Sequence, residues 1–285
     1  MKTKKWLTSG IVSTLALAFV LTGCGKSSTE GAAASPAGSP AAAAASGTGP
    51  ESLKSKGKLV VGVKYDTKLF GLKNPTNNEV EGFDVDIAKA LAKELLGDEK
   101  KIELKEVTSK TRIPMLDNKE IDMIVATMTI NEERKKQVDF SDVYFKAGQS
   151  LLVKKGSAIK GIADVKKGTK VLAVKGATSV ANIKAKAPEA TVLEFDNYQD
   201  AFSALKAGQG DTLTTDNAIL YGMVAQDNKF EVVNEPPFTD EPYGIAIKKG
   251  ETALVTAVND ALKKLQSNGE YNKIYEKWIG KAPSK

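Results

Sequence analysis

From residue 58 onward, short runs of apolar, β-branched residues alternate with stretches in which apolar residues recur every three or four positions. The run KLVVGVK (58–64) predicts a buried strand, and KIELKEV (101–107) and IDMIVAT (121–127) predict two more. The residues SKTRIPMLDNKE (109–120) predict a short helix interrupted by Pro114, and NEERKKQV (131–138) predicts a further helical turn.

The stretch GFDVDIAKALAKELLG (82–97) predicts the clearest amphipathic helix in this part of the chain. Ile87, Leu91 and Leu95 fall on one face of a 3.6-residue period. Asp84 and Asp86 stand at the expected N-terminus, where the helix dipole favours negative charge, and Gly97 provides a stop.

A second series of strands and helices begins after residue 150. It comprises strands at KVLAVK, TVLEF, GDTLTT and FEVV, with helices at SVANIKAKA, NYQDAFSALKAG and DNAILYGMVAQ between them. Two series of similar size predict an α/β protein with two lobes and mainly parallel sheets. Two amphipathic helices are predicted for the end of the chain.

The first residues form a separate segment. A basic start, MKTKKW, precedes the apolar run LTSGIVSTLALAFV and then LTGC, which is the pattern of a signal peptide with a core too short for a comfortable membrane span. LTGC resembles the lipobox of bacterial lipoproteins, so residues 1–23 are expected to be removed and Cys24 lipidated. The alternative is an ordinary signal peptide followed by an accidental or buried cysteine.

Residues 24–50 are rich in Ala, Ser, Gly and Pro and carry little charge. Such a segment buries too little apolar surface to offset its ordering entropy, so we expect a flexible tether. A polyalanine helix is the alternative, but Gly, Ser and Pro interrupt it. A lipid followed by a tether predicts a domain held at the outer face of the cytoplasmic membrane or in a periplasm.

Composition narrows the possible chemistry. The 285-residue chain carries a formal charge of +6, no histidine and one cysteine. Removing Lys2, Lys4 and Lys5 with the signal segment leaves a mild excess of dispersed lysines, which is not typical of a nucleic-acid-binding protein. Without histidine or a cysteine pair, a zinc site and an intramolecular disulfide are not expected.

Polar residues gather where predicted strands give way to helices, the place where open α/β sheets bind ligands. In ATMTINEERKK (126–136), Arg134 could hold a carboxylate with both arms of its guanidinium. The alternatives are a solvated Arg on a helix face and, for Thr129 with Glu132, a capping box. The turn KGATS (175–179) resembles an anion-binding turn, although such turns are common. Asp216 could pair with an ammonium group or merely cap the helix that follows it.

Together these residues provide a carboxylate clamp, an ammonium partner and hydroxyl groups. They provide neither an activated nucleophile nor an evident acid/base pair. The set is complementary to an α-amino acid, and no enzymatic activity and no cofactor are expected.

Four segments carry a resemblance to a known family: GFDVDIAKALAKEL, ATMTINEERKKQVDFSD, VLAVKGATS and YNKIYEKWIG. In this order they resemble the extracellular solute-binding proteins of family 3, the substrate-binding lipoproteins of polar amino-acid ABC transporters, in the aspartate, glutamate and glutamine branch. The similarity spans nearly all of residues 55–280. It implies the type II periplasmic-binding-protein fold, with residues 51–147 and 246–285 in one lobe, 148–245 in the other, and two hinge strands between them.

The resemblance also implies roles for matching residues. Arg134 would hold the ligand's α-carboxylate, helped by Thr129 and a backbone N–H near Ser179. Asp216 would take the α-ammonium with the Thr127 carbonyl, and Phe70 would contact the aliphatic stem. The full set of expected ligand-binding residues is Lys64, Asp66, Phe70, Arg112, Thr127, Thr129, Arg134, Lys175, Thr178, Ser179 and Asp216.

Lys64 and Arg112 match positions that bind the distal carboxylate in acidic-ligand relatives. If both side chains point inward, a neutral amide would leave their charge uncompensated, which favours glutamate or aspartate over glutamine. The alternative is a surface Lys64 and an Arg112 engaged in an internal ion pair. Many relatives carry TTDD or HD where this chain has TTDN, so Asn217 replaces a second acid.

The resemblance implies delivery of the ligand by a monomer to an ABC permease through lobe closure. Alternatives are a glutamine-binding protein of the same system, a dehydratase-like enzyme using Glu81 or Glu235, and a surface adhesin or a sensory ligand presenter.

Overall fold

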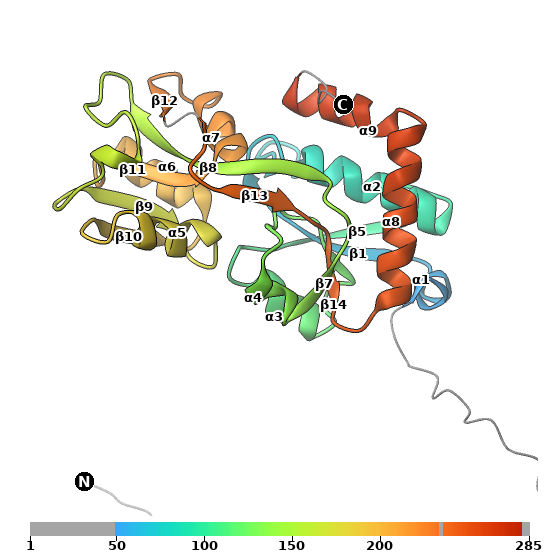
Figure 1. Cartoon of the computed structure of the whole chain (residues 1–285). Coiled ribbons are helices and arrows are strands. Elements are labelled where there is room, and N and C mark those ends of the chain that lie inside the picture. Colours follow the sequence, from blue (N-terminus) through green and yellow to red (C-terminus); the bar gives the residue numbers. More distant parts are fainter. Residues whose placement is uncertain (1–48, 234–235, 281–285) are drawn as a thin grey trace, which may run out of the picture. The chain divides into compact units, whose positions relative to one another are not determined.

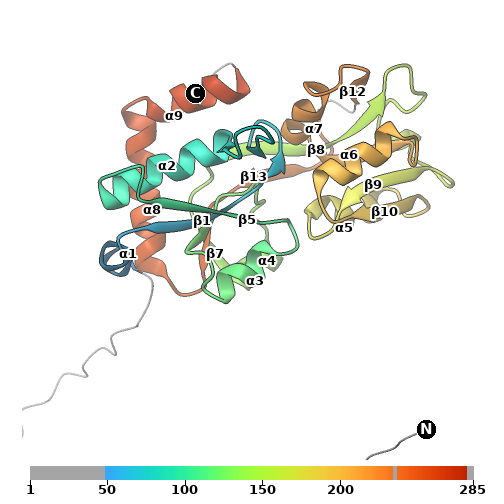
Figure 2. The same cartoon turned by 180° about the vertical axis from the view of Figure 1, so that it is seen from behind.

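The computed structural model describes residues 49–233 and 236–280, all within one compact unit, Ser46–Lys285. The predicted signal segment, Cys24 and the predicted tether lie outside the described residues. Two large sheets, each flanked by helices, make up this unit (Figures 1 and 2). None of the described helices has the length and apolar character that a bilayer span requires.

The first lobe is built on a five-stranded sheet in the order β5-β1-β6-β14-β7. Its strands are β1 (Leu59–Val63), β5 (Ile102–Glu106), β6 (Met123–Ile124), β7 (Val138–Phe140) and β14 (Ala246–Lys248). β1 pairs in parallel with β5 and β6, whereas β14 is antiparallel to β6 and β7. A small antiparallel sheet beside it consists of β2 (Asp66–Thr67), β3 (Gly71–Lys73) and β4 (Val80–Glu81).

Six helices belong to this lobe: α1 (Pro50–Lys56), α2 (Phe83–Leu96), α3 (Arg112–Asp117), α4 (Glu132–Lys135), α8 (Thr252–Ser267) and α9 (Glu270–Ile279). α2 confirms the helix predicted over 82–97. It buries Ile87 and Leu91, packs against α8 and α9, and ends at Gly97, whose φ of 79° is the left-handed conformation that glycine adopts without steric cost.

The second lobe is built on strands in the order β10-β9-β11-β8-β12. Its elements are β8 (Phe145–Lys154), a 3₁₀ turn (Ile162–Asp164), β9 (Lys170–Val174), α5 (Thr178–Lys186), β10 (Thr191–Phe195), α6 (Tyr198–Lys206), β11 (Thr212–Asp216), α7 (Asn217–Val224) and β12 (Phe230–Val233). β9, β10 and β11 are parallel, so their carboxyl ends meet at one edge. Helices α5, α6 and α7 begin at that edge, where α/β sheets bind ligands.

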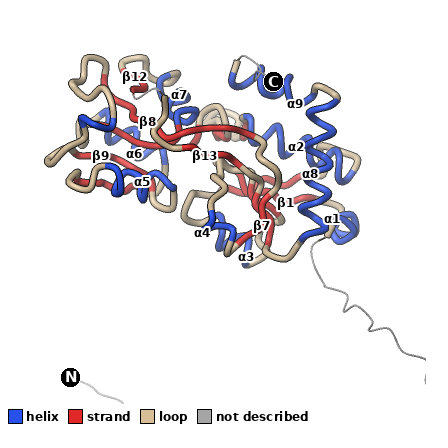
Figure 3. Tube along the Cα trace, viewed as in Figure 1, coloured by secondary structure: helices blue, strands red, loops and turns tan. Residues whose placement is uncertain are grey.

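Two neighbouring strands connect the lobes. β8 leaves the first lobe, and β13 (Asp240–Tyr243) returns to it, with Tyr243 opposite Phe145 and Asp240 opposite Gly148 in an antiparallel ladder. The two strands run side by side between the sheets (Figures 1 and 3). The predicted architecture of two α/β lobes joined by two hinge strands is therefore present. The prediction of mainly parallel sheets is wrong, because β14 and β8 run antiparallel to their neighbours and make both sheets mixed.

An aromatic cluster anchors both connecting strands. The ring centroid of Phe145 in β8 lies 5.1 Å from that of Phe70, 5.4 Å from that of Phe83 and 5.5 Å from that of Tyr243 in β13. All four side chains are buried. Such pairs stabilise a fold beyond their buried area, so the ends of the crossing strands are fixed to the first-lobe core. Phe70 therefore lies in this core, whereas the sequence had suggested that it contacts the aliphatic stem of the ligand.

Two predicted elements differ from the observed ones. Pro114 does not interrupt its helix, because it lies in the first turn of α3, where an N–H has no intrahelical acceptor to lose. The strand predicted over 121–127 keeps ladder pairing only at Met123–Ile124. Thr127 has a φ of 44°, so the backbone leaves the extended conformation before the predicted strand ends.

Candidate functional site

A small cavity lies between residues of the two lobes. The first lobe lines it from the loop before α3, from α3, from the loop after β6 and from α4, and the second lobe lines it from the starts of α5 and α6 and the end of β11. The lining residues are Ser109, Arg112, Thr127, Thr129, Arg134, Ala177, Thr178, Tyr198, Thr215 and Asp216. Six of the expected ligand-binding residues are thus brought together.

Arg134 points inward from the short helix α4. Its side chain is buried, Nη1 donates to the Thr129 carbonyl at 2.8 Å, and Nη2 donates to the Gly176 carbonyl of the second lobe at 3.1 Å. The solvated-helix alternative therefore does not describe this residue. The capping-box alternative fails too, because Asn131, not Thr129, caps α4 by accepting the Arg134 N–H at 2.8 Å.

Thr127 holds an unusual backbone conformation beside Arg134. A positive φ is disfavoured for a β-branched residue and persists where the surroundings fix it. Its N–H donates to the buried Asp84 Oδ2 at 2.8 Å, and its carbonyl lies 3.5 Å from Arg112 Nη1. The loop between β6 and α4 is therefore held from both sides.

The two cations predicted to set specificity are both buried, but they face different partners. Arg112 lines the cavity, yet its Nη1 donates to the Ala126 carbonyl at 2.7 Å. Lys64 lies behind the lining: Nζ donates to Ser109 Oγ at 3.0 Å and lies 5.2 Å from the centre of the Tyr198 ring. Burial lowers the pKa of the Lys64 ammonium to about 8 and also lowers the pKa of Arg112.

Three buried acids face these cations. Asp216 accepts the Tyr243 hydroxyl at 2.6 Å, and its side chain makes no capping bond to α7. Asp84 accepts the Tyr144 hydroxyl at 2.8 Å. The pKa of the Asp84 carboxyl and that of the Asp216 carboxyl are each raised to about 7, chiefly by burial, and for Asp216 the neighbouring Glu241 contributes to this rise.

The start of α5 supplies the second-lobe wall. Ala177 and Thr178 line the cavity, and Thr178 Oγ1 donates to the buried Glu241 at 2.8 Å. Ser179 is buried directly behind them, and its Oγ has no hydrogen-bond partner among the described residues. No side chain caps α5, so its first backbone N–H groups remain available to an anion.

Two other expected site residues lie outside the cavity lining. Lys175 is exposed and pairs with Asp196 at 2.8 Å, because its side chain projects from the turn before α5 toward the end of β10. Asp66 accepts the Tyr198 N–H at 2.7 Å and so joins the lobes beside the cavity. Asp66 therefore contacts the opposite lobe instead of the cavity.

The set of expected ligand-binding residues left out four lining residues: Ser109, Ala177, Tyr198 and Thr215. Ala177 and Thr215 nevertheless lie in the KGATS and TTDN junctions that the sequence indicated. Tyr198 begins α6 directly after β10 and its Asn197 cap, so the strand-end rule that identified the other junctions also covers it. The buried Glu241, on a connecting strand, had no comparable sequence signal. Glu81, a candidate acid for an enzyme, is exposed, and Glu235 lies outside the described residues.

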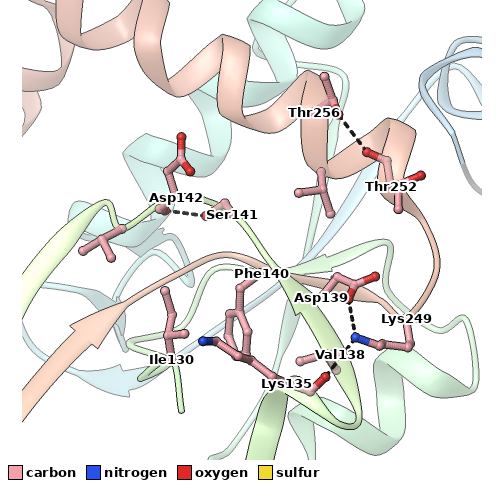
Figure 4. Close-up of a pocket in the computed structure, with 12 residues that line it drawn as sticks. Ile130, Lys135, Val138, Asp139, Phe140, Ser141, Asp142, Lys249, Thr252 and Thr256 are labelled. Carbon is pink, nitrogen blue, oxygen red and sulfur yellow. Dashed lines mark hydrogen bonds and ion pairs between the residues drawn. The ribbon is translucent and has the colours of Figure 1, made fainter. Parts of the chain in front are cut away.

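A larger, more open groove lies elsewhere on the first lobe, between β7 and the start of α8 (Figure 4). It measures about 720 Å³, and one of its walls carries Lys249 Nζ bonded to Asp139 at 2.6 Å. Ile130, Phe140 and Val143 contribute apolar surface to it. Its other charged side chains, Lys135 and Asp142, pair with Glu132 and Lys263 outside the groove. The charged groups therefore do not converge on one point, so the smaller cavity is the better candidate for a site that binds a small polar molecule.

Metal chemistry finds no support in the part of the chain that the structure describes. Residues 49–233 and 236–280 contain no group of three or more His, Cys, Asp or Glu side chains placed to hold a metal ion.

Comparisons with known proteins agree with this architecture. Residues 59–281 match the model of the bacterial extracellular solute-binding proteins, family 3. The chain is 58% identical over 281 residues to the ABC transporter glutamine-binding protein GlnH of Bacillus subtilis (strain 168), covering 99% of each. It is 59% identical over 246 residues to the glutamine-binding protein of Geobacillus stearothermophilus, covering 86% of this chain and 93% of that one.

Among solved structures, an ancestral arginine-binding protein bound to glutamine superposes with a TM-score of 0.74. It is 46% identical and matches 79% of this chain and 99% of its own. The two-lobed fold, the family match and the identity over nearly the whole length lead to one conclusion. The chain belongs to the bacterial extracellular solute-binding proteins of family 3.

Proposed function

We propose that this chain is the amino-acid-binding component of an ABC transporter and that its ligand lies in the cavity between the lobes. The observation that carries this proposal is the presence of Arg134 and Asp216 on one cavity between the lobes. A guanidinium suits the α-carboxylate, and a carboxylate suits the α-ammonium group. Thr127, Thr129 and the start of α5 add backbone and hydroxyl groups around them.

Lobe closure would convert binding into delivery. The cavity takes its walls from both lobes, so a ligand contacts all of them only when the lobes are together. Its greater affinity for that arrangement would shift the population toward the closed form. A permease could then distinguish the loaded protein from the free one.

Glutamine is the ligand we propose, in preference to the glutamate or aspartate favoured by the sequence alone. The two relatives at 58% and 59% identity are both named as glutamine-binding proteins. At this identity over most of both chains, the ligand named for the relatives is a better guide than the ligand inferred from Lys64 and Arg112.

The buried charges favour the same choice. Three cations (Lys64, Arg112 and Arg134) are accompanied by three buried acids (Asp84, Asp216 and Glu241). A glutamine zwitterion adds no net charge to this balanced set, whereas glutamate adds one negative charge. The argument for an acidic ligand assumed that Lys64 and Arg112 would otherwise remain uncompensated, which is costly for buried charges. Because buried acids already accompany them, that argument no longer holds.

Calorimetry with both amino acids tests the ligand. We expect glutamine to bind at least about tenfold more tightly than glutamate, which corresponds to roughly 1.4 kcal/mol. The ligand should be recovered unchanged after incubation, as we propose that the chain is not an enzyme. Tighter binding of glutamate would refute glutamine specificity while leaving the amino-acid site intact.

Substituting Arg134 tests the carboxylate clamp. Arg134→Lys keeps the charge but removes the planar fork, so we expect affinity for every amino acid to fall at least about tenfold. Lys136→Ala is the matched control on the same segment, because Lys136 is exposed and pairs only with Glu133. Similar affinities for both variants would exclude Arg134 as the clamp.

The affinity should depend on pH through Asp216. The pKa of its carboxyl is raised to about 7, so lowering the pH through this value protonates the proposed ammonium partner. Below this pH the affinity should fall as the pH is lowered, by at most about tenfold per pH unit, because one group is protonated while glutamine keeps both its charges. Asp216→Asn should bind weakly at pH 8 with a flatter profile. A wild-type affinity independent of pH would contradict this role.

We also propose that Cys24 carries the lipid that holds the domain at the membrane. The family description places such proteins outside the cytoplasm, and the lipobox-like LTGC stands at the end of an apolar leader. Labelling cells with a radioactive fatty acid should mark the wild-type chain but not Cys24→Ala. Equal labelling of both chains would disprove lipidation at Cys24.

A further inference from the structure

The second lobe has a chemically distinct end opposite the cavity. In its sheet, Lys170 pairs with Thr191, Val171 with Thr212, and Lys154 with Phe230. The carboxyl end of β8 and the amino ends of β9, β10, β11 and β12 therefore meet at one edge. The helices α5 and α6 end at this same edge, since each leads back to the start of a strand.

Exposed lysines gather on this edge, which we call the lysine end. Its nine members come from the end of β8, the start of β9, the loops beside these strands and before β12, and the ends of α5 and α6. They are Lys154, Lys155, Lys160, Lys166, Lys167, Lys170, Lys186, Lys206 and Lys229. The turns are tied together by backbone bonds, for example from the Lys155 N–H to the Lys229 carbonyl at 2.8 Å. Residues from distant parts of the sequence thus form one basic surface.

Few of these lysines have an acidic partner. The described residues form thirteen ion pairs, and just one of these, Lys160 with Glu231 at 3.7 Å, involves the lysine end. Lys206 lies over the ring of Phe202. For the other seven side chains no ion pair is formed with a described residue, although residues 148–245 contain twelve acids and eleven lysines.

The acids of the lobe explain this imbalance. Those near the lysine end number five: Asp164, Glu189, Asp211, Asp227 and Glu231. Others, including Glu194, Asp196 and Glu241, lie toward the carboxyl ends of the strands or on the connecting strand. The lobe is therefore polarised, with positive charge at the end away from the cavity.

We propose that the lysine end docks on the anionic phospholipid surface of the membrane at which this protein works. A binding component of an ABC transporter operates next to lipid headgroups, and clustered lysines are attracted electrostatically to anionic ones. The strands between the lysine end and the cavity span about 15 Å, more than the screening length of about 8 Å in physiological salt. Docking therefore leaves amino-acid binding undisturbed.

Vesicle co-sedimentation tests this proposal. The chain from Gly25 to Lys285, which contains the whole compact unit but no lipid, is mixed with vesicles of phosphatidylglycerol and phosphatidylcholine in equal parts, or of phosphatidylcholine alone. We expect binding to the anionic vesicles only, weakened by added salt. Binding of glutamine, measured in the presence and absence of vesicles, should not change.

A matched pair of variants separates the lysine end from total charge. Lys155→Gln, Lys166→Gln and Lys167→Gln together should weaken vesicle binding at least about tenfold. Lys100→Gln, Lys119→Gln and Lys273→Gln remove the same charge from exposed lysines of the first lobe without ion pairs, and should bind almost as the wild type does. Unchanged thermal unfolding shows that both variants fold.

Three outcomes would overturn the proposal. The first is that the protein does not bind the anionic vesicles, and the second is that the two triple variants weaken vesicle binding equally. The third is that the lysine-end variant binds soluble polyphosphate more weakly than the wild type but binds vesicles equally well. The first two leave the amino-acid site untouched, since that site is tested by calorimetry without lipid.

Discussion

The guanidinium of Arg134 is the group on which the arrangement of the cavity depends. One of its arms donates to the Thr129 carbonyl in the first lobe, and the other donates to the Gly176 carbonyl in the second. A planar fork can satisfy two acceptors in fixed directions, which an ammonium on a flexible chain cannot do as well. A single side chain thus sets the distance between the β6–α4 loop and the turn before α5, and the cavity lies between them.

The three buried cations, Lys64, Arg112 and Arg134, are tolerated because buried acids from other elements compensate their charge. Asp84 comes from the first turn of α2 and fixes the Thr127 backbone, while Glu241 comes from a connecting strand and holds Thr178. Each acid thus compensates charge and also positions a wall of the cavity. This dual role links the electrostatics of the site to its geometry.

Much of this could be anticipated from the sequence, because strand ends in α/β folds converge on one place. That rule identified Thr127, Arg134, Thr178 and Asp216. It failed for Lys175, because the position of a residue at a strand end does not fix the direction of its side chain. It could not reveal Glu241 either, since a charge that acts across an element boundary leaves no local pattern. For the same reason, the sequence showed the cations Lys64 and Arg112 without the buried acids that accompany them, and it therefore favoured an acidic ligand.

The two connecting strands have a consequence for how the lobes can move. Because β8 and β13 are paired over four residues, they form a single ribbon, not two independent tethers. Sliding one lobe along the other would shift the register of this ladder and break its hydrogen bonds, whereas bending or twisting the ribbon would preserve them. The fold would therefore restrict the relative motion of the two lobes to a few rotations, and each closing would return Arg134 to the Gly176 carbonyl along nearly the same path.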